Sequence, residues 1–224
     1  MEQTGLYNQL APSAKGNIYD NRGLKLSQSS LSTPLPMLAC PTDPEAAQPR
    51  KDQFIASMTD LDETVTSYKG VLGATKVGAT DGSVWPRHDD EPRPAVDCHN
   101  NTGKLACKGI FWRNAYLHPV KLKDITDGTS KTLLIGESVV AHDYHSVALY
   151  ADGDWAACNI PLNYLPKPPV PQIWWNVRGF RSLHAGGANF TRADGSVRFT
   201  DETIDMNVYI ALSTKARGDS TGGE

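Results

Sequence analysis

The sequence predicts an α+β domain with a mainly antiparallel sheet. Asp194-Gly195 separates two runs rich in β-branched and aromatic residues, 189–193 and 196–200, and this pattern is a strong signal for a β-hairpin. Residues 206–215 then carry apolar side chains at helical spacing. The chain also holds 19 Gly and 15 Pro, which favours many turns between short strands over long helices.

Length and charge limit the class of protein. At 224 residues the chain is long enough to bury a core, and we expect a single domain over residues 1–224. The hydrophobic share of 39% rises to about 47% when the 19 glycines are included, which is ordinary for a globular protein and argues against disorder. A net charge of −3 without a basic cluster argues against nucleic-acid binding.

Short apolar runs predict the remaining elements in chain order. Leu6, Tyr7 and Leu10 are spaced as at the end of a helix. Strands are expected at 64–73, 109–113, 132–136 and 146–150, and the apolar run at 132–136 is typical of a buried central strand. Two stretches, 74–108 and 140–175, have the composition of loop-rich insertions. Five prolines between Pro161 and Pro171 exclude a helix there.

The hairpin signal also predicts a register. A two-residue loop at Asp194-Gly195 pairs Phe190 with Phe199 and Arg192 with Val197. Phe190, Val197 and Phe199 then share one face of the hairpin. After the hairpin, Asp205 is placed to cap the helix, whose inner face carries Met206, Tyr209, Ile210 and Ser213, and Gly218 stands where a C-cap is expected.

The four cysteines predict a disulfide framework. Cys98 and Cys107 bracket a polar loop of the kind that a disulfide closes, which leaves Cys40 and Cys158 for a second bridge. Four cysteines allow three pairings, and four buried free thiols are the alternative. Disulfides favour an oxidising compartment.

The C-terminal part contains a histidine, nine residues and then Asp-Gly, from His184 to Asp194-Gly195. This spacing resembles the H-X9-DG signature of the DUF1559 family, prepilin-type proteins abundant in planctomycete-like bacteria and also labelled as solute-binding. Further matches follow in family order: Leu6-Tyr7-Asn8-Gln9-Leu10, Leu38-Ala39-Cys40-Pro41-Thr42-Asp43-Pro44, the weaker Ser67-Tyr68-Lys69-Gly70, and the stretch from Asp124-Ile125-Thr126-Asp127-Gly128 to Ile135-Gly136-Glu137.

The resemblance implies a pilin-like fold, with an N-terminal helix packed on an antiparallel sheet. It implies a non-enzymatic structural subunit of a pseudopilin, type II secretion-like or type IV pilus-like assembly in the cell envelope. Family members typically begin with a prepilin leader and a long apolar helix, and this sequence starts about where that helix ends. We therefore expect a native form anchored through an upstream helix, with other pilin-like subunits as partners.

The signature residues have two interpretations. His184 and Asp194 could form a catalytic or metal-binding pair. Alternatively, His184 hydrogen-bonds the loop or the Asp194-Gly195 turn and fixes the hairpin, and this structural role is the one we predict. Gly186 and Gly187 support it, because glycines there indicate a close backbone approach.

No cofactor is expected, with calcium as the one candidate ion. Asp127 and the hydroxyls beside it offer the hard oxygen ligands that calcium prefers, and Asp152 and Asp154 do so at alternate positions. Related major pseudopilins of type II secretion systems hold calcium in a C-terminal loop. Asp127-Gly128 also has the composition of a plain turn, which is its alternative role.

Aromatic and histidine residues in the loops suggest two other functions. Trp155, Trp174 and Trp175 are candidates for an exposed platform in an extracytoplasmic module that binds a carbohydrate or another solute. The alternative is that these tryptophans cover the core. A metal-dependent hydrolase would need His142, His145 and His184 around one ion, and the sequence lacks a full metalloprotease motif.

Overall fold

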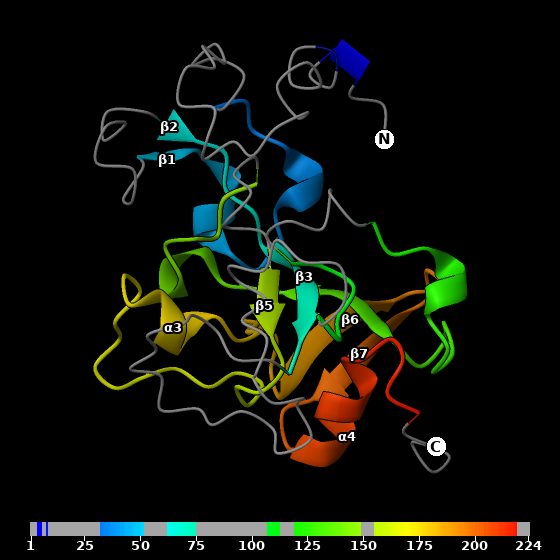
Figure 1. Ribbon diagram of the computed structural model, residues 1–224. Helices are drawn as coiled ribbons and strands as arrows, with labels where there is room; N and C mark the ends of the chain where they lie inside the picture. Colours follow the sequence, from blue (N-terminus) through cyan, green and yellow to red (C-terminus); the bar gives the residue numbers. More distant parts are fainter. Residues whose placement is uncertain are drawn as a thin grey trace.

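A computed structural model describes residues 4–5, 8, 32–51, 62–74, 107–112, 119–148 and 155–218. The main feature is a five-stranded sheet with the order β5-β3-β4-β6-β7 (Figure 1). Its strands are β3 (Tyr68–Gly73), β4 (Leu133–Glu137), β5 (Trp155–Ala157), β6 (Gly187–Arg192) and β7 (Val197–Asp201). β5 runs parallel to β3 and every other pair is antiparallel. The α+β class with a mainly antiparallel sheet is confirmed.

Short elements surround this sheet. A separate two-stranded ladder joins β1 (Arg50–Lys51) to β2 (Asp62–Glu63). The helices are η1 (Pro36–Leu38), η2 (Pro44–Ala47), η4 (Leu122–Asp124), η5 (Val140–His142), α3 (Trp174–Val177) and α4 (Met206–Leu212). Residues 4, 5 and 8 are helical, as expected near the start, but the packing of this helix lies outside the described residues. No helix in the described ranges is long and apolar enough to cross a membrane.

Two of the strands predicted before the hairpin are present in the sheet, whereas the other two are not. The run at 132–136 is β4, the middle strand, and the run at 64–73 contains β3. Residues 109–112 are not a strand, because the backbone N–H groups of Ile110 and Phe111 both donate to one acceptor, the Val71 carbonyl. At 146–148 a single bridge joins Val147 to Val65 in place of a strand, and residues 149–150 lie outside the described part.

The β6–β7 hairpin exists, but its predicted register is wrong by one residue. Phe190 pairs with Arg198, and Asn189 pairs with Phe199. The loop has three residues instead of two, because Gly195 at φ +86° donates its N–H to the Arg192 carbonyl. A one-residue slip moves side chains to the opposite face, so Phe190 is buried while Phe199 is 51% exposed.

The main core lies between the sheet and α4 (Figure 1). Phe190 contacts Phe180 and Tyr209 edge-on, with ring centroids 5.1 and 6.0 Å apart. Asp205 caps α4 as predicted, because its carboxylate accepts from the N–H groups of Asn207 and Val208. Gly218 is not the C-cap, since the helix ends at Leu212 and Ser213 takes that position. Tyr209 and Ser213 are buried on the predicted inner face.

The predicted close backbone approach is present at Gly187 but not at Gly186, where a Cβ would meet nothing within 4 Å. A Cβ at Gly187 would lie 2.1 Å from the Thr200 carbonyl oxygen on β7. We expect Gly187→Ala to lower the free energy of unfolding by about 1–3 kcal/mol or more, because backbone has to move to admit the methyl group. Chemical denaturation measures the change. Gly5→Ala is the control, because a Cβ there meets nothing within 4 Å, and an equal loss in both variants would contradict the prediction.

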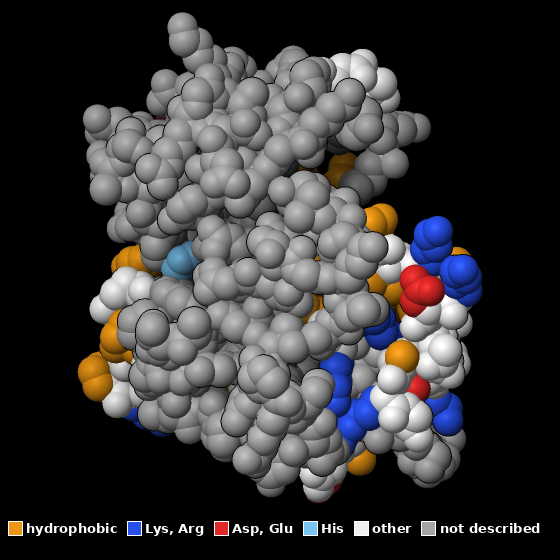
Figure 2. Space-filling model, viewed as in Figure 1, with side chains coloured by type: hydrophobic (Ala, Val, Ile, Leu, Met, Phe, Trp, Pro, Cys, Tyr) orange, Lys and Arg blue, Asp and Glu red, His pale blue; other side chains and the backbone are white. Residues whose placement is uncertain are grey.

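The surface of the described part carries side chains of several chemical types. Figure 2 shows basic, acidic and apolar side chains interspersed on the described part of one face. The large apolar side chains exposed in the described ranges include Met37, Leu122, Leu183, Val197 and Phe199. Val197 and Phe199 are two residues apart on β7, the edge strand, so they form an exposed apolar pair on one face of the sheet.

Candidate functional site

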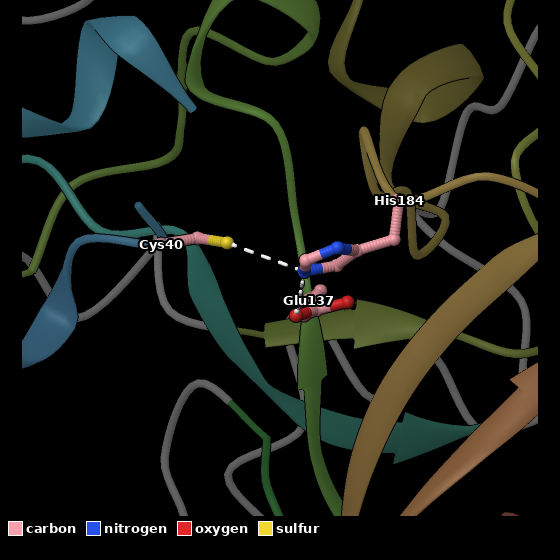
Figure 3. A group of neighbouring side chains, drawn as sticks. All are labelled: Cys40, Glu137 and His184. Atoms are coloured by element: carbon pink, nitrogen blue, oxygen red, sulfur yellow. Dashed lines mark hydrogen bonds and ion pairs between the residues drawn. The ribbon is translucent and has the colours of Figure 1, made fainter. Parts of the chain in front are cut away.

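Three motifs that are far apart in the sequence meet at one point. Cys40 lies between η1 and η2, Glu137 ends the central strand β4, and His184 stands in the loop before β6. Figure 3 shows the Cys40 and Glu137 side chains directed at the His184 imidazole from these three segments. Among the described residues, these three side chains form the one group of potential metal ligands whose ligand atoms all lie within 4.8 Å of one another.

Both neighbours contact the same ring nitrogen of His184. Nε2 lies 3.4 Å from Glu137 Oε1 and 3.7 Å from Cys40 Sγ. Cys40 and Glu137 are buried, whereas the His184 side chain is 33% exposed. Cys40 and Glu137 therefore form the buried part of the site, and His184 is its partly exposed member.

The backbone fixes the positions of these side chains. Asn189 holds the Glu137 carboxylate at both oxygens, with its N–H 2.7 Å from Oε2 and its amide nitrogen 3.1 Å from Oε1. Tyr68 pairs with Glu137 across the sheet, and burial, Cys40 and Glu137 together raise the pKa of the Tyr68 hydroxyl. The Cys40 segment is attached by Asp43, whose carboxylate accepts from the Ser67 hydroxyl at 3.0 Å.

A second polar cluster is buried next to β3. Lys69 Nζ lies 2.6 Å from Asp143 Oδ2, and neither side chain is exposed. His145 Nδ1 lies 3.3 Å from the other oxygen of the carboxylate. Burial raises the pKa of the Asp143 carboxyl, but Lys69 and His145 outweigh this effect and hold it well below its ordinary value. Burial lowers the pKa of Lys69 to about 8, so the pair is charged at neutral pH.

His145 gives the fold a pH dependence. Burial, with Arg178 nearby, lowers its pKa from 6.5 to about 4. The unfolded chain therefore binds a proton between these values that the folded chain does not, and stability falls as pH falls from 6.5 towards 4. We expect this group to remove about 3 kcal/mol over that window. Urea titrations at several pH values measure it, and His145→Gln should flatten the slope; a variant with the wild-type slope would contradict the prediction.

The two Asp-Gly turns bind each other instead of binding His184. The Asp194 N–H donates to the Thr129 carbonyl at 3.1 Å, and the Ala193 N–H donates to the Thr132 carbonyl at 2.9 Å. The predicted contact of His184 with the Asp194-Gly195 turn is wrong, because the six-residue strand β6 separates them. The same separation removes the His184–Asp194 pair as a catalytic or metal-binding unit. The alternative contact within the loop is present, since the His184 N–H donates to Ser182 Oγ at 3.1 Å.

Asp127 joins its turn to the C-terminal segment. Its carboxylate accepts from the N–H groups of Arg217 and Gly218, at 2.7 and 2.8 Å. Gly128 has φ +100°, the conformation that a glycine permits in such a turn. Calcium at Asp127 stays a prediction, and Asp152 and Asp154 lie outside the described residues.

One of the two cysteine predictions is confirmed at Cys107, and the other is wrong. Cys107 forms a disulfide, as predicted, while its predicted partner Cys98 lies outside the described residues. The Cys40–Cys158 bridge is wrong, because both are free thiols. Cys158 is buried in the main core beside Tyr209, whereas Cys40 faces His184.

The structure removes residues from the predicted tryptophan platform and from the predicted three-histidine site. Trp155 is buried under the Arg178 guanidinium, 4.2 Å from its ring centroid, so it is not part of an exposed platform. Trp174 and Trp175 begin α3, and their side chains lie outside the described residues. His142 and His145 do not belong to the group around His184, so the three-histidine site is not formed.

The sequence did not indicate Glu137 as a site residue, and it assigned Cys40 to a disulfide. The available signal was that both residues belong to family motifs: Glu137 ends the stretch that begins at Asp124, and Cys40 lies within the stretch from Leu38 to Pro44. A family model described as a protein of unknown function (DUF1559) matches residues 1–207. No curated protein and no solved structure matches the chain.

Proposed function

Because this chain belongs to the DUF1559 family, over residues 1–207, we propose that it is the globular head of a non-enzymatic, pseudopilin-like subunit in a bacterial cell envelope. An apolar helix upstream of the head would anchor it and assemble it with other pilin-like subunits. The resemblance to prepilin-type proteins is the source of this proposal, and the structure adds an observation that supports it.

That observation is the structural use of the signature turns. Asp194-Gly195 binds the Thr129–Thr132 segment through backbone hydrogen bonds, and Asp127 binds the backbone of Arg217 and Gly218. The signature residues therefore connect two turns and the C-terminal segment, and such a structural role supports a structural subunit. The disulfide at Cys107 supports an extracytoplasmic location, because such bonds persist in oxidising compartments.

The outer strand of the hairpin supports subunit contacts. Val197 and Phe199 are 64% and 51% exposed on β7, the edge strand of the sheet. Exposed apolar side chains on one face of an edge strand favour contact with another protein surface.

The test is the N-terminus of the protein from its own cells, identified by mass spectrometry of membrane and shed fractions. We expect an upstream apolar segment whose first residue is N-methylated, the product of prepilin processing. A native chain with an unmethylated start and no upstream helix would overturn the assembly mechanism.

A solute-binding module is the alternative prediction. It now depends on Trp174 and Trp175, because Trp155 is buried. Calorimetry with a broad glycan set tests it: a ligand whose binding is lost in Trp174→Ala would favour this function over the structural one.

A further inference from the structure

We propose that Cys40, Glu137 and His184 bind a zinc ion. Their ligand atoms, a sulfur, a carboxylate oxygen and an imidazole nitrogen, lie within 4.8 Å of one another. The inference is independent of the pseudopilin proposal, since it depends on the geometry of these side chains and not on assembly.

The spacing of the ligand atoms fits a tetrahedral zinc site. Zinc binds thiolate sulfur at about 2.3 Å, and nitrogen or carboxylate oxygen at about 2.0–2.2 Å. These bond lengths separate tetrahedral neighbours by about 3.6 Å for sulfur and nitrogen and about 3.4 Å for nitrogen and oxygen. The corresponding distances here are 3.7 Å from Cys40 Sγ to His184 Nε2 and 3.4 Å from that nitrogen to Glu137 Oε1.

The donor set and its charge select the kind of ion. A thiolate and an imidazole favour zinc over calcium or magnesium, which take oxygen ligands. The Cys40 thiolate and the Glu137 carboxylate would supply two negative charges, which balance a divalent cation in a buried position. Three protein ligands leave one position of the tetrahedron for a water molecule or another ligand.

A nucleophilic cysteine is the competing explanation, and the geometry disfavours it. In a Cys–His pair oriented by a carboxylate, the thiol contacts one ring nitrogen and the carboxylate holds the other. Here both Cys40 and Glu137 face Nε2. Convergence of three ligand atoms on one point is the arrangement of a metal site.

Outer contacts orient two of the ligands, as metal sites require. Asn189 binds both oxygens of Glu137 and so fixes the direction of Oε1. The Thr42 hydroxyl lies 3.1 Å from Cys40 Sγ, where it can donate to a thiolate.

Zinc binding to the full chain, purified without metal or reductant and under anaerobic conditions, tests the proposal. Competition with a chromogenic chelator should give one equivalent per chain. Cys40→Ser, Glu137→Gln and His184→Ala should each weaken binding about 100-fold or more, and Asn189→Ala by about 10–100-fold. Cobalt(II) should show a thiolate charge-transfer band that Cys40→Ser abolishes.

Matched controls keep the test decisive. Cys158→Ala removes the other free thiol and His142→Ala removes a histidine outside the group, so both should retain wild-type affinity. If Cys40→Ser fails to fold, zinc protection of Cys40 from iodoacetamide, present in the wild type and absent in His184→Ala, gives the same answer. Absence of a one-equivalent site, or equal affinity in His184→Ala and the wild type, would overturn the proposal whatever the outcome for assembly.

Discussion

Replacing Asp143 by Ala is expected to lower the free energy of unfolding by about 3–5 kcal/mol. Asp143 and Lys69 are fully buried and 2.6 Å apart, so removal of the carboxylate leaves an ammonium group in the interior without its partner. Arg178 and Arg181, also buried, lie close enough to shift the pKa of Lys69 downward, and they increase the cost of losing the anion. Urea denaturation followed by tryptophan fluorescence measures the change.

Two controls separate burial of charge from simple loss of an ion pair. The pair Lys51–Asp62 has a separation of 3.5 Å but side chains that are 62% and 49% exposed, so Asp62→Ala should cost less than about 1 kcal/mol. The double variant Lys69→Met with Asp143→Leu removes both charges and should recover part of the loss, because Arg181 and the His145 N–H still lack the carboxylate. If Asp143→Ala cost no more than Asp62→Ala, the buried pair would not be a main determinant of the fold.

Local patterns predicted the parts of this fold that depend on neighbours in the sequence. The apolar run at 132–136 predicted a central strand, and β4 lies between β3 and β6 in the middle of the sheet, with Leu133 buried and Ile135 partly buried. Asp205 was predictable as a cap because its carboxylate bonds N–H groups two and three residues away. The turns at Gly128 and Gly195 were predictable for the same local reason.

The candidate site depends on distances that no local pattern contains. Cys40 and His184 are 144 positions apart, and they meet because β4 places Glu137 between their segments. Cysteine count alone paired Cys40 with Cys158, since the sequence does not say that one faces His184 and the other enters the core under α4. No sequence pattern links Lys69 to Asp143, and only their shared burial makes them a pair.

The hairpin shows how one torsion angle decides which side chains are buried. Asp-Gly favours a two-residue loop, and with that loop Phe190 and Phe199 would face each other on one side of the sheet. Gly195 instead closes a three-residue loop, with the Asp194 carboxylate accepting from the Ser196 N–H at 2.9 Å. Glu137 then lies beside Asn189 and Phe199 on one face, and Phe190 points to the other.

Phe190→Ala and Phe199→Ala test this register with the same substitution on two adjacent strands. Phe190 is 1% exposed and packs edge-on against Phe180 and Tyr209, so its truncation should cost about 3–5 kcal/mol. Phe199 is half exposed, and its truncation should cost less than about 1 kcal/mol. The two-residue loop would instead predict similar losses at both positions. Equal destabilisation in denaturant titrations would therefore reject the observed register, whereas a difference of about 2 kcal/mol or more would establish that the three-residue loop sets the two faces of the sheet.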